Sequence, residues 1–506
     1  MNRRSFLKNS IAGGAVLALP KWLQAGETSK EKPNIILILT DDLGWGDLSC
    51  YPQNPDFPDA KLRTPNIDSL AAEGVRCTQA YATCMVCAPS RAGLLAGRYQ
   101  QRFGWYEFKE TLVGMPKDQV MLQEYLKKQG YTTACIGKWH LGERLDTGPL
   151  ARGFDRFFGF LGGQHDYFDP NLGDPIHGFS FDYDAYTYDQ DKPVDKIEYY
   201  TDELTNRSLD FINEQAAKER PFFLYLPYST PHPPMQSTWE KLMPYADSRN
   251  GRFNIRDIAR AMIDSLDEGV GKILDRLMHL GIDRETIVIF TSDNGGADDR
   301  GEGQAIVQHN GGLRPRKGLY WEGGIRVPMI FRWPNAIPEG VTYEKPISHL
   351  DIFATIAAIV GDNPKPKELD GVDLIPFFNA KKTDSPHEIL FWGQEEHVGR
   401  WAVRKGKWKL TRDYITPKTL YSKEYVMATE LHDLEADPYE NNDLADKYPE
   451  KVKELKALLE TFFKTNAPTI ATPEVMQKWQ KDIEDRKEKL PNPDLLRRDG
   501  APEHWL

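Results

Sequence analysis

Four short apolar runs stand out in the first part of the chain, at residues 35–39, 132–136, 222–226 and 287–290. Almost all of their residues are apolar, which is typical of strands buried on both faces of a parallel sheet. Longer segments with helical spacing separate these runs. The alternation predicts an α/β fold in which crossover helices flank a mainly parallel sheet.

Three of the separating segments carry clear helix signals. Thr64 and Pro65 suit the cap and the first position of a helix, and Gly74 stands where that helix would end. A second helix is expected over 119–129, just before a glycine. The longest periodic stretch, 255–277, places apolar residues on one helical face and leads into the last apolar run.

The pattern changes after residue 385. Shorter apolar segments are expected to form strands at 389–392, 401–404 and 408–410, and an amphipathic helix follows over 452–462. We therefore predict a main domain over 26–385 and a smaller α+β domain over 386–506, which ends in a polar tail.

The amino-terminal segment 1–25 has the pattern of an export signal. It begins with Arg3-Arg4-Ser5-Phe6-Leu7-Lys8, continues through an apolar run at 11–19 and reaches Leu23-Gln24-Ala25, which resembles a twin-arginine signal with a cleavage site. The alternative, a membrane anchor, needs about 20 apolar residues, and neither this run nor any later one is long enough. We expect a periplasmic or secreted protein without a membrane span.

Composition narrows the class of partner. The chain has 506 residues, 27% of them charged, and a formal net charge of −11. These are ordinary values for a globular protein, and the acidic balance disfavours a nucleic-acid partner. If the ligand is an anion, a local cluster of Lys, Arg and His must therefore bind it.

Acidic and amide residues follow two of the predicted strands directly. Asp41 and Asp42 come after the first run, and Asp293 and Asn294 come shortly after the fourth. A single such pair usually caps a helix or a turn. Two pairs at strand ends are different, because ligands of open α/β sheets bind at the carboxyl ends of the strands. The oxygen-only set predicts a site for Ca²⁺ or Mg²⁺ rather than for zinc.

Basic residues follow the other two runs. Lys138 and His140 come after the second run, and His232 comes after the third. Taken singly, Lys138 is most simply a solvated lysine and His232 a loop histidine. The stretch 130–138 is not a phosphate-binding Walker loop, because its glycine spacing is wrong and Trp139 replaces the Ser or Thr. Together the three supply the local positive charge that an anion requires.

The segment from Cys84 to Arg98 has three interpretations. Cys84 and Cys87 form a C-x-x-C pair, but no second pair or thioredoxin-like pattern accompanies it. They are alternatively two buried thiols. In the third interpretation Pro89 opens a helix, so that Cys87 lies at a helix amino terminus, which favours anions, and Arg91 projects toward the same place.

Several motifs together resemble the type I sulfatases. Cys87-Ala88-Pro89-Ser90-Arg91 followed by Leu94-Leu95-Ala96-Gly97 resembles the first family signature, and residues 130–140 resemble the second. Further matching segments occur in family order: Asp41-Asp42, Thr64 to Asp68, Thr230-Pro231-His232, Asp293-Asn294-Gly295, Lys317 to Pro328 and Leu431 to Leu444. The resemblance covers roughly residues 33–445.

The resemblance implies an alkaline-phosphatase-like α/β core and assigns a role to each matching residue. Asp41, Asp42, Asp293 and Asn294 are implied to hold one Ca²⁺, or Mg²⁺, together with a Cα-formylglycine made from Cys87 by a formylglycine-generating enzyme. Arg91 and Lys138 are implied to steady the hydrated formylglycine. Lys138, His232 and Lys317 are implied to bind the sulfate oxygens, and His140 to assist breakdown of the covalent intermediate.

The implied chemistry is consistent with general principles. One hydroxyl of an aldehyde hydrate, activated by the cation and a base, can attack sulfur, and the other can then expel sulfate by reforming the aldehyde. Export of the folded chain leaves time for oxidation of Cys87 in the cytoplasm. The chain has 5 Cys, so four remain after that modification, which would allow up to two disulfides.

Substrate specificity must come from outside the sulfate site. We expect the weakly periodic region 143–220 to line the substrate cleft, with His165 as the best single candidate for a substrate contact, and we note the aromatic segment 392–401. The favoured substrate is a sulfated oligo- or polysaccharide of the galactose or N-acetylgalactosamine type. The alternatives are a phosphonate or phosphodiester hydrolase of the same superfamily and a non-catalytic glycan-binding relative.

Overall fold

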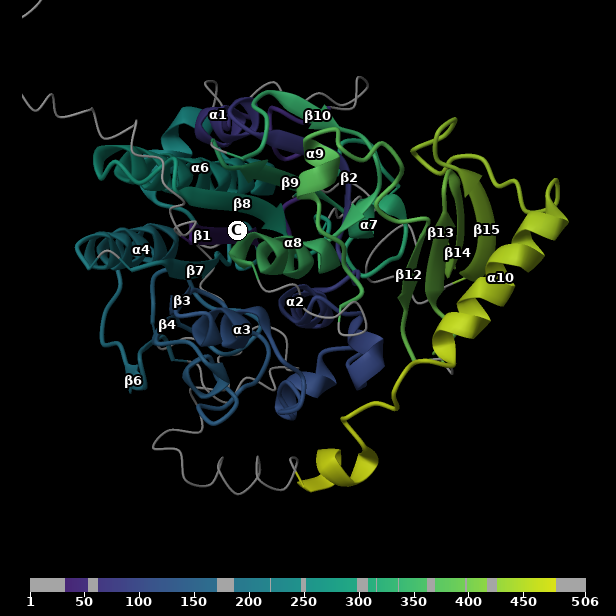
Figure 1. The fold of residues 1–506 in the computed structure, drawn as a ribbon, viewed down its shortest axis with the longest axis horizontal. Helices are drawn as coiled ribbons and strands as arrows, with labels where there is room; N and C mark the ends of the chain where they lie inside the picture. Colours follow the sequence, from purple (N-terminus) through teal and green to yellow (C-terminus); the bar gives the residue numbers. More distant parts are fainter. Residues whose placement is uncertain are drawn as a thin grey trace, which may run out of the picture. The chain divides into compact units, whose positions relative to one another are not determined.

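A large sheet runs through the centre of the fold, with helices on both of its faces (Figure 1). The computed structural model describes residues 32–52, 62–170, 186–218, 220–246, 252–297, 308–314, 316–334, 336–361, 369–395, 398–415 and 426–478. The predicted signal at 1–25 and the last part of the polar tail lie outside these ranges. Among the described helices, none is long and apolar enough to cross a membrane.

The central sheet has 11 strands in the order β10-β2-β9-β8-β1-β7-β3-β4-β5-β6, with β11 paired to β2. Their bounds are β1 Asn34–Thr40, β2 Val75–Tyr81, β3 Thr132–Ile136, β4 Arg156–Gly159, β5 Tyr188–Asp189, β6 Lys192–Pro193, β7 Phe222–Pro227, β8 Thr286–Ser292, β9 Arg326–Arg332, β10 Val341–Tyr343 and β11 Ile347–Ser348. The four predicted runs are β1, β3, β7 and β8. They are neighbours, joined by the parallel pairs β8–β1, β1–β7 and β7–β3. The predicted fold class is confirmed.

The sheet is not parallel throughout. Strand β9 runs antiparallel to both β2 and β8, and β5 runs antiparallel to β4 and β6. Arg326 and Arg332 begin and end β9, and Pro328 interrupts its sequence, so it does not read as a continuous apolar run. Its pairing partners lie far away in sequence, which is why the pattern of single residues did not reveal it.

Alternate residues of β1 belong to two separate cores. Ile35, Leu37 and Leu39 pack in a cluster with residues of α2, α3 and α8, whereas Ile36 and Ile38 pack with α1, α4 and α6. Successive side chains of a strand point to opposite faces, so an all-apolar strand needs a helical layer on each side. Figure 1 shows the two layers on opposite sides of the sheet, with α1, α6 and α4 toward the upper left and α8, α2 and α3 toward the lower right.

The helices that form these layers have the following bounds: α1 Pro65–Ala72, α2 Cys87–Ala96, α3 Leu122–Lys128, α4 Tyr200–Ala216, α6 Ile255–His279 and α8 Leu350–Val360. The short helices are α5 Trp239–Leu242, α7 Glu322–Ile325 and α9 Ile375–Phe378. The helices expected at Pro65, within 119–129 and over 255–277 are all present.

The long helix α6 begins where local chemistry dictates. The Asn254 side chain accepts a hydrogen bond from the Asp257 amide at 2.9 Å, and the Asp257 carboxylate accepts one from the Asn254 amide at 3.1 Å. This reciprocal arrangement satisfies amide groups that the first turn leaves free. It places the start of the helix one residue after Asn254.

The region 143–220 differs from the prediction. Instead of irregular structure throughout, it contains the helix α4, 17 residues long, which buries Leu204, Phe211 and Ile212 in the second core. Its many polar residues face away from that core, so the apolar spacing is sparse and hard to recognise in the sequence. Residues 171–185 of this region lie outside the described part.

A second, antiparallel sheet follows in the order β12-β13-β14-β15. Its strands are β12 Ile389–Gly393, β13 Trp401–Lys405, β14 Trp408–Ile415 and β15 Val426–Asp433, and the helix α10 Pro449–Phe463 packs on it through Leu455 and Leu459. The expected strands and helix are therefore present. Residues 33–506 cluster as one compact unit, so the domain boundary at residue 385 stays a proposal.

Candidate active site

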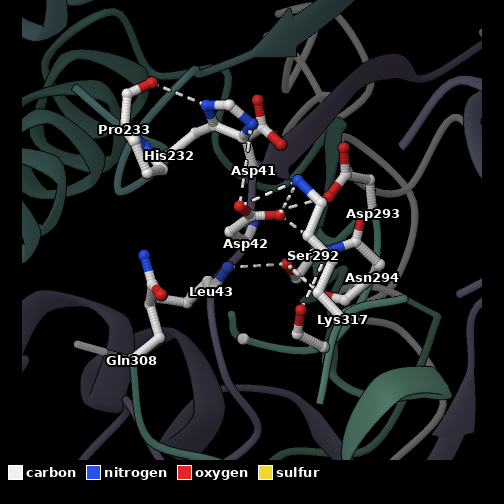
Figure 2. A network of polar contacts seen from close by, with 12 residues as sticks. Asp41, Asp42, Leu43, His232, Pro233, Ser292, Asp293, Asn294, Gln308 and Lys317 are labelled. Atoms are coloured by element: carbon white, nitrogen blue, oxygen red, sulfur yellow. Dashed lines mark hydrogen bonds and ion pairs between the residues drawn. The ribbon is translucent and has the colours of Figure 1, made fainter. Parts of the chain in front are cut away.

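The candidate site lies at the carboxyl ends of four adjacent strands of the central sheet. Strands β8, β1, β7 and β3 end in this order across the sheet, and each continues into a loop that carries predicted site residues. Figure 2 shows the side chains from three of these loops turned toward one another. Parallel pairing therefore brings together residues that lie far apart in sequence.

The predicted metal ligands form one buried group. Asp41, Asp42, Asp293 and Asn294 are at most 1% exposed. The Asn294 amide donates a hydrogen bond to Asp42 Oδ1 at 2.8 Å, and the Asp42 backbone amide lies 3.4 Å from Asp293 Oδ1. Asp42 has a φ of 64°, a left-handed conformation that Asp tolerates better than most residues.

Two oxygens of this group have no hydrogen-bond partner. They are Asp41 Oδ1 and Asn294 Oδ1, both buried among the described residues. Buried polar atoms are nearly always paired, so two unpaired acceptors beside other carboxylates fit a cation. Two sets of three side chains each bring one possible ligand atom per residue within 4.8 Å of the others. The first set is Asp41, Cys87 and Asp293, and the second is Asp41, Asp42 and His232. A hard divalent cation fits this oxygen-rich set.

Each of the three carboxylates lies closest to a different cationic side chain. Lys138 Nζ lies 2.6 Å from Asp41 Oδ2, Arg91 Nη2 lies 2.7 Å from Asp293 Oδ2, and Lys317 Nζ lies 2.7 Å from Asp42 Oδ1. The formal charges of these three pairs cancel. A bound divalent cation would therefore leave the site positive, which suits an anionic ligand in a protein of acidic net charge.

Cys87 begins the helix α2, and Val86 caps that helix in an extended conformation. The helix starts here because Pro89 lies in its first turn, where a missing amide hydrogen is tolerated. Arg91 lies one turn further on and also donates a hydrogen bond to the Lys138 carbonyl at 3.1 Å. The helix thus holds Cys87 at the cation group and uses Arg91 to connect it to β3.

Burial and neighbouring charges lower the pKa of some of these groups and raise the pKa of others. Burial favours the neutral forms of Asp41 and Asp42, but the positive charges of Lys138 and Arg91 beside Asp41 and of Lys317 beside Asp42 oppose it, and both pKa values lie below the usual range. Burial and the charge of Asp41 raise the pKa of Asp293. Burial also raises the pKa of Cys87, although Lys138 and Lys317 oppose this effect. An unmodified Cys87 is therefore mainly a neutral thiol at pH 7 and a weak nucleophile.

His232 contacts the same carboxylates. Its Nδ1 lies 2.7 Å from the Pro233 carbonyl, which places the ring hydrogen there and leaves Nε2 facing Asp42 Oδ2 at 3.7 Å. Burial lowers the pKa of His232, so the ring is neutral at pH 7 in this environment. A lone pair aimed at a carboxylate is unfavourable, which again fits a cation between them.

His140 lies beside the group in a left-handed conformation, with a φ of 55°. Its ring stacks on Phe108 with centroids 5.8 Å apart, and its buried Nδ1 has no hydrogen-bond partner among the described residues. A Cβ at Gly163 would come within 2.8 Å of His140 Nε2, so a glycine is needed there. Burial and the charge of Lys138 hold the pKa of His140 well below its usual value. The His140 ring is therefore neutral at pH 7.

His165 lies outside this group. It is 3% exposed, its ring stacks on Tyr200 with centroids 5.3 Å apart, and its Nε2 lies 3.3 Å from Thr187 Oγ1. These contacts place it in an aromatic cluster with Phe160 rather than against the cation group. Its role as a substrate contact stays a prediction.

The structure adds residues that the sequence did not single out. Gln308 is fully buried beside the group in Figure 2 and donates a hydrogen bond to the Pro231 carbonyl at 2.9 Å. Ser292 accepts a hydrogen bond from the Leu43 amide at 3.0 Å, which ties the end of β8 to the loop after β1. Neither residue type carries a distinctive spacing, so no sequence signal marked them.

The second sheet positions the loop that carries Lys317. Asp413 accepts a hydrogen bond from the Tyr320 amide at 2.6 Å and pairs with Arg400 at 2.7 Å. Arg400 in turn donates to the Gly318 carbonyl and lies 3.4 Å from Met85 Sδ, two residues before Cys87. The second sheet therefore contributes to the geometry of the site although it supplies none of the predicted site residues.

The structure pairs none of the cysteines. Cys50, Cys77, Cys84, Cys87 and Cys135 are all described and all free. The disulfides that their number allowed are therefore not formed, and the C-x-x-C pair of Cys84 and Cys87 is open. Cys84 instead has its Sγ 3.9 Å from Tyr320 Oη.

A buried histidine behind the site should make the stability depend on pH. His349 is fully buried, with Nδ1 3.4 Å from Ser90 Oγ and Nε2 3.2 Å from Thr291 Oγ1. Burial lowers its pKa from 6.5 to about 3. The unfolded chain therefore takes up a proton below pH 6.5 and the folded chain does not, so stability is full above pH 6.5 and falls as the pH drops toward 3.

Because of His349, we expect the free energy of unfolding to be about 2 kcal/mol lower at pH 5 than at pH 8. Chemical denaturation at both pH values measures this difference. The His349→Gln variant lacks the titrating group, so its unfolding free energy should fall by about 2 kcal/mol less than that of the wild type. Equal losses in the two proteins would contradict the assignment.

Comparison with known proteins gives a consistent picture. The sequence model of the Sulfatase family matches residues 33–361, and that of the N-sulphoglucosamine sulphohydrolase C-terminal family matches 316–465. N-acetylgalactosamine-6-sulfatase of Mus musculus is 35% identical over 382 residues, which cover 71% of this chain and 68% of the mouse protein. Arylsulfatase G of Rattus norvegicus is 31% identical over 440 residues, 79% of each chain.

A solved structure extends the similarity to nearly the whole chain. The crystal structure of Ps i-CgsB in complex with k-i-k-neocarrahexaose superposes with a TM-score of 0.73 at 30% identity. The match covers 91% of this chain and 99% of the other. The similarity of fold therefore extends over both the central sheet and the second sheet.

Proposed function

The chain belongs to the sulfatase family, and from this premise we propose that its site releases sulfate from a sugar unit of a sulfated glycan. The protein is a sulfuric ester hydrolase, as the sequence motifs indicated. We favour a galactose or N-acetylgalactosamine unit. The relative from Mus musculus is named for N-acetylgalactosamine 6-sulfate, and the structure of Ps i-CgsB contains a neocarrahexaose.

The observation that carries the proposal is the buried cation group with its two unpaired oxygens. In the described part of the chain, Asp41 Oδ1 and Asn294 Oδ1 lack hydrogen-bond partners, while three carboxylates are balanced by three cations. Sulfatases generally use a divalent cation and a formylglycine. We propose that Asp41, Asp42, Asp293 and Asn294 hold Ca²⁺, with Mg²⁺ as the alternative, together with a formylglycine derived from Cys87.

The hydrated formylglycine would supply the attacking hydroxyl and a route for releasing sulfate. The chain's own residues would orient the sulfate group and neutralise its negative charge. Lys138, His232 and Lys317 contact Asp41 and Asp42, and they would bind sulfate oxygens as negative charge shifts onto them. Arg91 holds Asp293 and the Lys138 carbonyl, so it keeps the Cys87 helix in register with the cation group. His140, whose Nδ1 has no hydrogen-bond partner among the described residues, would assist breakdown of the covalent intermediate.

We also propose export through the signal at residues 1–25. A twin-arginine route carries folded chains, so a formylglycine-generating enzyme would act on Cys87 before export to the periplasm or beyond. This order explains how a residue that is only 2% exposed in the folded protein becomes modified, because the modifying enzyme can reach it before folding is complete.

A direct assay tests the function. We expect protein produced with a formylglycine-generating enzyme to release sulfate from galactose 6-sulfate or N-acetylgalactosamine 6-sulfate, measured by ion chromatography. The kcat/KM for the better sugar sulfate should exceed that for bis(p-nitrophenyl) phosphate by about tenfold or more.

The comparison also decides between the alternatives. Faster turnover of the phosphodiester would favour a phosphodiester hydrolase. A protein that carries the aldehyde at residue 87 but turns over neither class of ester, while binding the sugars, would favour a glycan-binding relative.

A further inference from the structure

A second pocket lies where the second sheet meets the segment that contacts His140. It has a volume of about 490 Å³ and opens to solvent. Its walls include Tyr106, Gln394, Glu395, Phe463, Asn466 and Thr469. Tyr106 belongs to the central-sheet part of the chain, Gln394 and Glu395 follow β12, and the last three come from the end of α10 and the loop after it. The pocket is therefore built from three separate segments.

Two amide side chains leave polar atoms unpaired in this pocket. Gln394 is only 6% exposed, and it donates a hydrogen bond from Nε2 to Glu107 Oε1 at 2.7 Å, while its own Oε1 has no partner among the described residues. Nδ2 and Oδ1 of Asn466 are also buried, and neither has a partner in the described part of the chain. Buried polar groups are nearly always paired, so these atoms indicate a ligand that both donates and accepts hydrogen bonds. Hydroxyl groups do both.

The walls are held in place before any ligand binds. Tyr106 Oη donates to the Ala467 carbonyl at 2.6 Å, and Thr469 Oγ1 donates to Glu110 Oε1 at 2.6 Å. The Ala467 amide donates to the Gln101 carbonyl at 2.9 Å. A pre-formed pocket loses little conformational entropy when it binds a ligand.

The charge of the pocket indicates a neutral ligand. Its one carboxylate, on Glu395, pairs with Lys109 Nζ at 2.5 Å. Among the described residues that line it, none is Lys or Arg, so it offers no cation of its own lining for a second sulfate. Tyr106 and Phe463 add aromatic surface, which packs well against the C–H face of a sugar ring.

Two structural connections join this pocket to the sulfate site. Phe108, two residues after Tyr106, stacks on the His140 ring. The Gln394 amide donates to the Arg400 carbonyl at 3.1 Å, and Arg400 contacts the Gly318 carbonyl next to Lys317. Two residues that line the pocket, Tyr106 and Gln394, are thus close neighbours of Phe108 and Arg400, which contact the loops of the sulfate site.

We propose that this pocket binds an unsulfated sugar unit of the same glycan whose sulfated unit occupies the site at Cys87. The proposal rests on the proposed function, since it takes the substrate to be a glycan. It makes the protein selective for an oligosaccharide with a neutral unit beyond the sulfated one. Asn466 and Gln394 act as the groups that recognise its hydroxyls.

The test compares two substrates in the full-length modified enzyme. One is the sulfated monosaccharide, and the other is an oligosaccharide that carries the same sulfated unit and otherwise neutral sugars. We expect Asn466→Ala to raise KM for the oligosaccharide by about tenfold, with little change in kcat or KM for the monosaccharide. Asn441→Ala, which removes an exposed amide after the same sheet, should change neither.

A structural defect would affect both substrates, so equal changes for both, or none for either, would overturn the proposal. Gln394→Leu keeps the size of a buried side chain and provides a second variant if Asn466→Ala lowers the melting temperature. Calorimetry with the desulfated oligosaccharide and the wild-type protein tests the pocket separately from the proposed sulfate release. Binding that Asn466→Ala abolishes would support the pocket even if no sulfate is released, whereas absence of binding would overturn it.

Discussion

Cys87→Ala should abolish sulfate release, with a loss of about 10⁴-fold or more in kcat. The reason is that Cys87 is proposed to become the only nucleophile, and the remaining groups would position sulfate without anything to attack it. The side chain is small and 2% exposed, so the variant should fold normally. Sulfate release and the melting temperature together measure both parts of this expectation.

The matched control is Cys84→Ala. Cys84 is equally buried and belongs to the same C-x-x-C pair, but its Sγ contacts Tyr320 rather than the cation group. This variant should keep most of the activity, and peptide mass spectrometry should find the aldehyde at residue 87 in it and in the wild type. A wild-type rate in Cys87→Ala, or equal losses in both variants, would contradict the proposed nucleophile.

Removal of divalent cations should have the second largest effect. Without a cation, Asp41 Oδ1 and Asn294 Oδ1 have no partner and the site carries no excess positive charge. We expect chelation to lower turnover by about 10³-fold and Ca²⁺ to restore it. Because the cation binds only the folded chain, Ca²⁺ at 100 times its Kd should also raise the free energy of unfolding by about 3 kcal/mol.

Thermal unfolding with and without Ca²⁺ checks this prediction, and the same titration with Mg²⁺ identifies the preferred ion. Asn294→Ala removes one proposed ligand and should lose most of the Ca²⁺-induced shift. Asp446→Ala, which removes an exposed carboxylate, should keep it. Activity that survives chelation, together with an unchanged melting temperature, would show that these oxygens do not bind a cation.

Much of the central fold was predictable because its signals are local. The runs that became β1, β3, β7 and β8 are apolar enough to require burial on both faces, and parallel sheets supply that environment. The carboxyl ends of parallel strands lie at one edge of the sheet. The sequence therefore predicts one group that contains Asp41, Lys138, His232 and Asp293. The structure confirms the convergence, and the roles of these residues stay proposals.

Other features depended on contacts between segments distant in sequence. Strand β9 lacks a clear apolar pattern and is held in the sheet by antiparallel partners on both sides. The helix α4 was hidden by its polar face. His165 was selected for its residue type, but its ring lies in an aromatic cluster whose members could not be known in advance.

The sequence by itself determined the fold class, the family and the set of residues at the strand ends. Apolar periodicity and short motifs are sufficient for these, because burial and local backbone geometry act on neighbouring residues. Only the tertiary structure decided which cation pairs with which carboxylate, how Asp413 and Arg400 hold the Lys317 loop, and where Asn466 and Gln394 form a pocket. Those arrangements depend on electrostatic and packing contacts that exist only once distant segments have met.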